Sequence, residues 1–252
     1  MRIVSLVPSW TETLIEAGEI VVGCTRFCIH PKSKVESLVR VGGTKNPNWE
    51  KIGELNPDLV IFDQEENNKE DFDNCPYPKW ASSIHDLNAC GKSLISLGKF
   101  LNNDRLEGWG KEYLNFSQRE RLEYSENTLA LLRWVNPPPT PSFAPKRVHY
   151  LIWKDPYMEV RSSTYIGSVL HTLGLKVPDS KGGVLYPEVN EEDIFKEDHL
   201  ILLSSEPYPF AKHVSQFKGK SGAIGLVDGE KMSWFGVRGL NFLKQVFESL
   251  QT

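Results

Sequence analysis

Thiol and imidazole side chains are the first candidates for chemistry in this sequence. Cys24 and Cys28 are separated by three residues, and His30 follows after one more. Thiolates and imidazoles are typical zinc ligands, but a structural zinc site needs a second pair, and no such pair follows elsewhere in the chain. Cys75 and Cys90 are too scattered to complete a disulfide framework. We therefore interpret the four cysteines as ordinary thiols, and the sequence leaves a bridge between Cys24 and Cys28 undecided.

Histidines and glycine-rich loops supply no catalytic motif. The six histidines are spread singly, without the helical spacing of metal ligands: His30, His85, His149, His171, His199 and His213. The segments GKS at 91–93 and 219–221 resemble the end of a phosphate-binding loop, but Asp86 and Val214 replace its first glycine. Dinucleotide-binding and nucleophile-elbow motifs are also missing from the sequence. We therefore predict that the protein is not an enzyme and has no catalytic cofactor and no metal centre.

Aromatic residues say more about a possible function than the cysteines, histidines and glycine-rich loops do. Five of them follow predicted strands or begin predicted helices: Trp10, Trp49, Trp153, Tyr157 and Trp234. Open α/β sheets bind ligands at the carboxyl ends of their strands, where these positions fall. A single tryptophan there is more often a packing residue, but five of them favour a cleft with aromatic walls. Such a cleft suits a large, flat and partly apolar ligand.

Strands and helices must position these residues, and they alternate in the first half of the chain. The predicted strands are residues 2–7, 21–24, 39–41 and 59–62. The helix after the first strand has Ser9 as its expected cap and Gly18 at its end, and Asn48 is the expected cap of a helix at 50–55. Apolar strands that alternate with helices indicate a mostly parallel sheet covered on both faces.

A long helical pattern follows this first half. Apolar residues keep helical spacing, and the stretch from Asp104 to Val135 predicts one helix that is about 48 Å long. Ser117 and Glu120 have the spacing of a capping box, so a new helix starting at Ser117 is the alternative. Residues 136–145 include five prolines and predict an extended connection.

The second half repeats the order of elements. Strands are predicted at 148–153, 200–203 and 224–227, and helices after Ser163, at 191–195 and at 238–250. We therefore predict an α/β protein whose two lobes, each with a mostly parallel central sheet, are joined by a long backbone helix. The predicted division is an N-terminal lobe at 1–101, the helix and proline-rich connection at 102–145, and a C-terminal lobe at 146–252.

Composition excludes two classes of function. The 252 residues include 29 Lys and Arg against 33 Asp and Glu, and no basic block indicates nucleic-acid binding. No stretch approaches the roughly 20 apolar residues of a membrane-spanning helix. The chain enters a strand directly after Met1, without the apolar segment of a secretory signal. This pattern predicts either a cytoplasmic protein or one whose leader has been removed.

Several segments resemble one known family. They are IVSLVPS at 3–9 with Thr11 and Glu12, LNPDLVI at 55–61, YLIWKDPYM at 150–158, SEPYPF at 205–210, and Trp234–Phe235 with Arg238. These segments are similar to the helical-backbone, class III substrate-binding proteins of ABC importers for cobalamin, haem and iron-siderophores. The resemblance is strongest to the cobalamin-binding branch. It covers nearly the whole chain in order and is weakest from about 102 to 145.

The resemblance implies a ligand, a partner and contact residues. The ligand would be cobalamin, or another metal tetrapyrrole or iron chelate, in a cleft between the lobes. Its implied contacts are Trp10, Trp49, Trp153, Tyr157, Trp234 and Arg238. Glu70 and Glu206 would dock the lobes onto arginines of an ABC permease dimer. The binding protein would be a monomer, located in the periplasm or at the cell surface where a leader has been removed.

Two alternatives stay open. A haem or iron-siderophore binder would use Tyr157 or a histidine as an axial ligand of the iron. A cytoplasmic enzyme or sensor of corrinoid or tetrapyrrole metabolism would use the same scaffold. The enzyme would require a poised acid, base or metal cluster, which scattered histidines do not provide.

Overall fold

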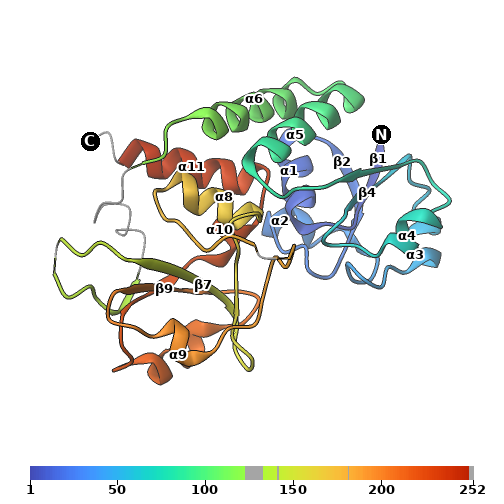
Figure 1. Ribbon diagram of the computed structural model, residues 1–252. Helices are drawn as coiled ribbons and strands as arrows, with labels where there is room; N and C mark the ends of the chain where they lie inside the picture. The colour runs from blue at the N-terminus through green and yellow to red at the C-terminus, as the bar shows by residue number, and fades with distance from the viewer. Residues whose placement is uncertain (123–132, 141, 181, 250–252) are drawn as a thin grey trace. The chain divides into compact units, whose positions relative to one another are not determined.

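The computed structural model describes residues 1–122, 133–140, 142–180 and 182–249. The chain forms two compact units, each with a five-stranded sheet (Figure 1). Unit 1 comprises Met1–Asn115 and Trp234–Asn241, and unit 2 comprises Phe116–Ser233 and Phe242–Thr252. The predicted class, an α/β protein with two mostly parallel sheets, is confirmed.

The sheet of unit 1 is parallel throughout, with the strand order β3-β2-β1-β4-β5. Its strands are β1 (Arg2–Ser5), β2 (Ile20–Cys24), β3 (Val39–Arg40), β4 (Leu59–Asp63) and β5 (Lys79–Ser82). The chain moves outward from β1 to β3 and then returns to place β4 on the other side of β1. The strand order therefore reverses between β1 and β4, the point at which open α/β sheets bind ligands.

Helices cover both faces of this sheet. They are α1 (Pro8–Ala17), α2 (Lys32–Val35), α3 (Trp49–Glu54), α4 (Lys69–Asp73) and α5 (Leu87–Leu101). Figure 1 shows α1 and α5 on one side of the strands, and α3 and α4 on the other. Alternate residues of β1 and β4, such as Val4 and Val60, pack with Ile52 of α3 in one buried cluster. The unbroken apolar sequence of β4 follows from this double coverage, because all five of its residues are buried.

Two expected helix caps in unit 1 have different outcomes. Asn48 accepts a hydrogen bond from the Lys51 amide over 2.9 Å, which confirms it as the cap of α3. The expected cap Ser9 is wrong, because α1 already begins at Pro8. A proline at the first helical position has its φ angle preset and needs no hydrogen bond from its nitrogen. Gly18 ends α1 as predicted, with a φ of 90° that favours glycine.

The helix predicted from Asp104 to Val135 is shorter in the structure. It begins at Asp104 as α6 and ends at Gln118, and residues 119–122 are not helical. Arg133–Asn136 instead form strand β6, which pairs antiparallel with β10 in unit 2. The predicted helix is therefore wrong at its carboxyl end, because pairing along a sheet edge outweighs helical spacing there. The intervening residues of the predicted helix lie outside the described part of the chain.

The sheet of unit 2 has the order β6-β10-β9-β7-β8. Its central strands β7 (Arg147–Trp153), β9 (His199–Ser204) and β10 (Ala223–Val227) are parallel, and the edges β6 and β8 (Met158–Glu159) are antiparallel. Its helices are α8 (Tyr165–Thr172), α9 (Glu191–Ile194), the 3-10 helix η1 (Phe210–Phe217) and α10 (Gly229–Ser233). The last helix, α11 (Val237–Ser249), contributes residues to both units.

One expected cap in unit 2 is displaced by a residue. Thr164, and not Ser163, caps α8, and its hydroxyl accepts from the Gly167 amide over 3.0 Å. The buried core beneath the carboxyl half of this sheet combines strand residues such as Leu203 with Tyr157, Phe210 and Phe217. Tyr157 belongs to the connection after β7, and Phe210 and Phe217 belong to the connection after β9. Their packing against the strand residues holds both connections to the sheet.

Candidate functional site

The first group of candidate side chains lies at the carboxyl ends of β1, β4 and β5. The indole nitrogen of Trp10 donates to Ser82 Oγ over 2.8 Å, and Ser82 Oγ donates to Asp63 Oδ2 over 2.5 Å. Trp80 and Phe235 meet the Trp10 ring edge to face, with centroids 5.2 and 5.4 Å away. Trp10 is 0% exposed. It therefore fixes neighbouring strand ends to one another and presents no indole surface to solvent.

Asp63 is the buried charge of this group. Burial raises its pKa above the ordinary carboxyl value, and hydrogen bonds from Ser82 and from the Glu65 amide oppose that rise. The Asn67 side chain accepts from the Asp63 amide over 2.8 Å and donates to Leu6 O over 3.3 Å. The loops after β1 and β4 are thereby tied together at the point where the strand order reverses.

Arg238 and Trp234 lie in a second part of unit 1. The Arg238 guanidinium forms two hydrogen bonds of 2.7 Å with the carboxylate of Glu12 on α1. It also lies over the Trp234 ring, 5.4 Å from the centroid, and the His30 ring meets Trp234 at 5.6 Å. The structure therefore brings Arg238 and Trp234 together. It also adds Glu12, which orients the guanidinium.

Trp49 belongs to a different environment. It is the first residue of α3, half-buried, and packs against the cluster that includes Val4, Ile52 and Val60. Trp10 instead packs with Trp80 and Phe235. These two predicted site residues of unit 1 therefore lie in separate packing clusters.

A cavity of about 440 Å³ opens beside β4 and α4. Phe62 and Phe72 give it apolar walls, and Asp63 and Asn67 give it polar ones. This volume falls within the range of about 300–1,000 Å³ that is common for small-molecule pockets. Glu70 lies in the first turn of α4, next to this opening in sequence, and its side chain is exposed.

In unit 2, the exposed aromatic candidate is Trp153, the last residue of β7. Its side chain is 41% exposed, and its ring meets Tyr208 edge to face at 5.7 Å. The Tyr208 amide donates to Ile152 O over 3.2 Å, which holds the loop after β9 against the end of β7. Tyr208 also contacts the ring of His213 at 5.4 Å. The sequence singled out Trp153, but neither its partner Tyr208 nor His213, which contacts Tyr208, was recognised as part of an aromatic group.

Tyr157 lies in the turn between β7 and β8 and is only 8% exposed. It packs in the core and meets Phe195 edge to face at 5.8 Å. Burial raises the pKa of Tyr157 to about 12, and the carboxylates of Glu191 and Asp155 act in the same direction. The side chain is therefore a neutral phenol near neutral pH.

Glu206 follows β9 in a loop that is held by serine hydroxyls. Ser233 Oγ donates to Glu206 Oε1 over 3.1 Å, and Ser204 Oγ donates to the Glu206 carbonyl over 2.6 Å. A Cβ added at Gly229 would approach Ser204 Oγ to 2.5 Å, so this close packing requires glycine. The half-buried carboxylate of Glu206 is thus oriented by its neighbours, unlike the exposed one of Glu70.

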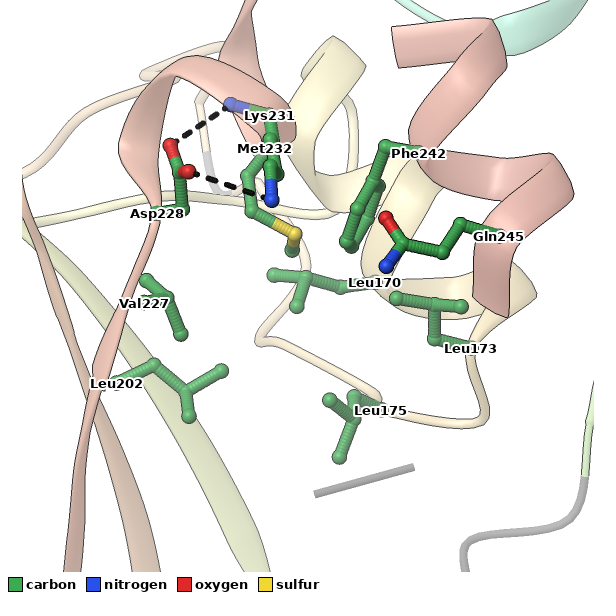
Figure 2. Close-up of a pocket in the computed structure, with 10 residues that line it drawn as sticks. All are labelled: Leu170, Leu173, Leu175, Leu202, Val227, Asp228, Lys231, Met232, Phe242 and Gln245. Carbon is green, nitrogen blue, oxygen red and sulfur yellow. Dashed lines mark hydrogen bonds and ion pairs between the residues drawn. The ribbon is translucent and has the colours of Figure 1, made fainter. Parts of the chain in front are cut away.

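A second cavity in unit 2 is small and mainly apolar. Its volume is about 60 Å³, and Figure 2 shows Leu170, Leu202 and Met232 pointing into it, with Asp228 and Lys231 at one side. Small-molecule pockets are commonly several times larger. This cavity therefore cannot enclose a ligand of tetrapyrrole size.

Two histidines that look isolated in the sequence are in contact in the structure. His149 Nε2 lies 3.0 Å from His199 Nδ1, and His149 Nδ1 lies 2.5 Å from Glu159 Oε2. The interpretation that all six histidines are spread singly is therefore wrong, because β7 and β9 are neighbouring strands. All three side chains are buried, and Arg161 pairs with Glu159 at 3.0 Å. Within the described residues, no group of three or more His, Cys, Asp or Glu side chains has the arrangement of a metal site.

Comparisons with known proteins now bear on this geometry. Residues 3–74 match the family model described as periplasmic binding protein. No curated protein matches the chain by sequence. In the described part of the chain, no helix combines the length and the apolar character needed to cross a membrane.

Three solved structures are similar over almost their whole length. The periplasmic vitamin B12 binding protein BtuF of Vibrio cholerae is 19% identical with a TM-score of 0.69, covering 99% of this chain and 96% of its own. The periplasmic heme-binding protein RhuT of Roseiflexus sp. RS-1 is 18% identical with a TM-score of 0.68, covering 98% and 97%. The siderophore binding protein FhuD of Vibrio cholerae, bound to Fe3+-Desferal, is 19% identical with a TM-score of 0.63, covering 99% and 97%.

These comparisons define the class of the fold. The chain has the two-sheet α/β fold that these periplasmic binding proteins share, which confirms the resemblance at the level of the fold, without preference for the cobalamin-binding branch. Proteins of this fold are named for a corrinoid, a haem and an iron chelate, with similar structural agreement for each. The fold alone therefore does not choose among the three ligands.

Proposed function

We propose that this protein is a substrate-binding protein that captures a metal chelate and delivers it to an ABC importer. The observation that carries the proposal is the fold, which agrees over 99% of the chain with a vitamin B12 binding protein. The match of residues 3–74 to the periplasmic binding protein family supports the same class by a different route. A role in the periplasm or at the cell surface follows from this proposal.

The chemistry of the strand ends supports a large, flat ligand. Trp153 keeps 41% of its surface exposed beside the half-buried Tyr208, and exposed aromatic surface supplies contact area at a low cost in conformational entropy. In unit 1, the Arg238 guanidinium is held by Glu12 and lies over Trp234, so its orientation is set before any ligand arrives. We assign Trp153, Trp234 and Arg238 as the principal ligand contacts and Trp49 as a further contact, whereas the fully buried Trp10 only positions its neighbours.

Among the metal chelates, we favour a corrinoid. The haem alternative requires a side chain that coordinates iron, and the sequence offers Tyr157 or a histidine for it. Tyr157 is only 8% exposed and packs against Phe195 in the core, and burial raises its pKa to about 12, so the phenolate that would bind iron is both covered and disfavoured. A corrinoid requires no such ligand from the protein, because stacking and hydrogen bonds at its periphery can supply the affinity.

Calorimetric titration with cyanocobalamin, haem and ferric desferrioxamine tests whether the protein binds a metal chelate and whether that chelate is a corrinoid. Saturable heat with cyanocobalamin alone supports the corrinoid assignment, and recovery of the unchanged ligand distinguishes binding from turnover. A Soret shift on haem titration that disappears in Tyr157→Phe would overturn the corrinoid assignment in favour of haem. The absence of binding to all three ligands would overturn the proposed function as a whole.

Delivery to an importer requires contacts with a permease, and we assign these to Glu70 and Glu206. An exposed carboxylate on α4 and an oriented one after β9 suit arginines on a partner, which fix orientation and speed association. The charge reversals Glu70→Arg and Glu206→Arg are expected to abolish ligand transfer to the permease while ligand affinity is unchanged. The matched reversals Glu50→Arg and Glu192→Arg, at exposed helix positions, serve as controls.

A further inference from the structure

Cys24 and Cys28 form a contact that the proposed ligand-binding role does not use. Cys24 ends β2, and a turn closed by the Cys28 amide and Thr25 O, 3.2 Å apart, brings Cys28 back toward it. Both residues are 0% exposed, and one guanidinium nitrogen of Arg40 contacts both of them, Cys24 at Sγ and Cys28 at its carbonyl oxygen. The turn and the shared guanidinium therefore bring the two cysteines together in one buried site.

Polar groups surround these sulfurs, although the site is buried. Arg40 donates from one guanidinium nitrogen to Cys24 Sγ over 3.0 Å, and the same nitrogen contacts Cys28 O at 2.7 Å. Cys28 Sγ lies 3.1 Å from Thr11 Oγ1 and 3.2 Å from Thr25 Oγ1. A guanidinium and hydroxyl groups stabilise a thiolate, so one negative charge can be held on the pair.

The two thiols differ in acidity. Burial by itself would raise the pKa of Cys28, but hydrogen bonds from Cys24, Thr11 and Thr25 outweigh it and lower that pKa to about 7. The hydrogen bond to Cys28, together with burial, raises the pKa of Cys24. Burial also raises the pKa of Cys75, and it raises that of Cys90 to about 12. Cys75 and Cys90 are thus buried thiols of the ordinary, unreactive kind and serve as internal references.

We propose that Cys24 and Cys28 are an oxidisable pair that closes into an intramolecular disulfide at the carboxyl end of β2. The oxidant is of the peroxide class, because a water-sized molecule can reach two fully buried sulfurs more readily than a bulky disulfide can. The pair is a modification site in its own right, and this inference does not depend on which ligand the protein binds.

The reaction balances in two steps. The Cys28 thiolate attacks one oxygen of hydrogen peroxide, the O–O bond breaks, and a sulfenic acid forms on Cys28 with release of hydroxide. The Cys24 sulfur then attacks Cys28 Sγ, the S–O bond breaks, and the leaving hydroxide takes the Cys24 proton to form water. The two thiols together lose two electrons and two protons, and one peroxide becomes two waters. Arg40 keeps its bonds to the carbonyls of Thr25 and Cys28.

The sequence supplies a direct readout of this disulfide. Arg26 lies between the two cysteines and is followed by Phe27, so trypsin cleaves between Cys24 and Cys28. The reduced full-length protein is treated with hydrogen peroxide, unfolded, alkylated, digested and examined by mass spectrometry. We expect the peptide that ends at Arg26 to be linked to the peptide that begins at Phe27, with a mass lower by two hydrogens than the sum of the two free peptides.

Controls separate this pair from nonspecific oxidation. Cys24→Ser and Cys28→Ser should each abolish the link, and the double variant Cys75→Ser/Cys90→Ser should retain it. If one of these variants does not fold, the disulfide links of the unsubstituted protein test the proposal without it. In that protein, Cys24 and Cys28 should be linked, and Cys75 and Cys90 should remain fully alkylated. Links that join Cys24 or Cys28 to another cysteine, or equal oxidation of all four thiols, would overturn the proposal.

The pH dependence of the oxidation rate tests the order of attack. The rate should rise with a midpoint near pH 7, where Cys28 becomes a thiolate. A rate that rises only above about pH 8.5, the ordinary range of a cysteine thiol, would contradict the attack by Cys28.

Discussion

Arg238 and Glu12 are joined by two parallel hydrogen bonds of 2.7 Å, although 226 positions separate them in the sequence. Their side chains are only 19% and 12% exposed, so water screens this pair weakly. Glu12→Gln should therefore lower the free energy of unfolding by about 1.5–3 kcal/mol, since the guanidinium loses a charged partner. A double-mutant cycle with Arg238→Gln, measured by urea denaturation, should give a coupling energy of about 1–3 kcal/mol.

The pair Lys69–Asp73 is the matched control for this cycle. It has a short contact of 2.6 Å, but its side chains are 87% and 51% exposed. Its coupling energy should be at most about 0.5 kcal/mol. Equal coupling energies in the two cycles would show that burial does not strengthen the Arg238–Glu12 pair.

Gly108 and Gly110 of α6 should respond in opposite directions to alanine. A Cβ at Gly110 would approach Gly91 O to 2.6 Å and the Ile95 amide nitrogen to 2.9 Å, so α5 and α6 could not keep their close contact. Gly110→Ala should therefore lower the free energy of unfolding by about 1–3 kcal/mol. Nothing lies within 4 Å of a Cβ at Gly108, and Gly108→Ala should raise stability by about 0.5–1 kcal/mol. Thermal and urea unfolding of the two variants measure both changes, and the same sign for both would contradict the packing argument.

These glycines also show what the sequence can and cannot predict. Three local signals were confirmed, because the apolar run of β4, the Asn48 cap and the turn at Gly18 each depend on neighbouring residues, whereas the caps expected at Ser9 and Ser163 were wrong. The sequence treats Gly108 and Gly110 alike, as two weak points in a helix. Only the packing of α5 against α6 distinguishes them.

Features that depend on strand order could not be predicted either, because the sequence does not show which strands become neighbours. His149 and His199 meet because β7 and β9 are neighbours, and no local pattern reveals that adjacency. Strand β5 was not predicted, so its Trp80 was missed as a partner of Trp10. The position of Trp153 at the end of β7 depends on one strand and could be predicted from the sequence, whereas its contact with a ligand stays a prediction.

The buried histidine pair should make stability depend on pH. Burial lowers the pKa of His199 below its ordinary value, and the neighbouring His149 and Lys196 act in the same direction, against the carboxylate of Asp198. The unfolded chain therefore takes up a proton on this histidine before the folded protein does. The stability from a neutral His199 is present above the unfolded pKa of about 6.5 and is lost as pH falls below it. Urea midpoints between pH 8 and 5 should fall less steeply in His199→Gln, and an unchanged slope would exclude His199 as the cause.

Trp153 should affect ligand affinity without affecting stability. With 41% of its surface exposed at the end of β7, it contributes little to the core, so Trp153→Ala should change the free energy of unfolding by no more than about 0.5 kcal/mol. As an aromatic contact of the ligand, it should lower the affinity for cyanocobalamin by about five- to tenfold, or about 1–1.4 kcal/mol. Calorimetry measures the affinity, and urea unfolding measures the stability. Phe100→Ala is the control, because Phe100 is an aromatic residue of α5 that is 54% exposed and lies away from the strand ends. Equal affinities for Trp153→Ala, Phe100→Ala and the unsubstituted protein would remove Trp153 from the ligand contacts.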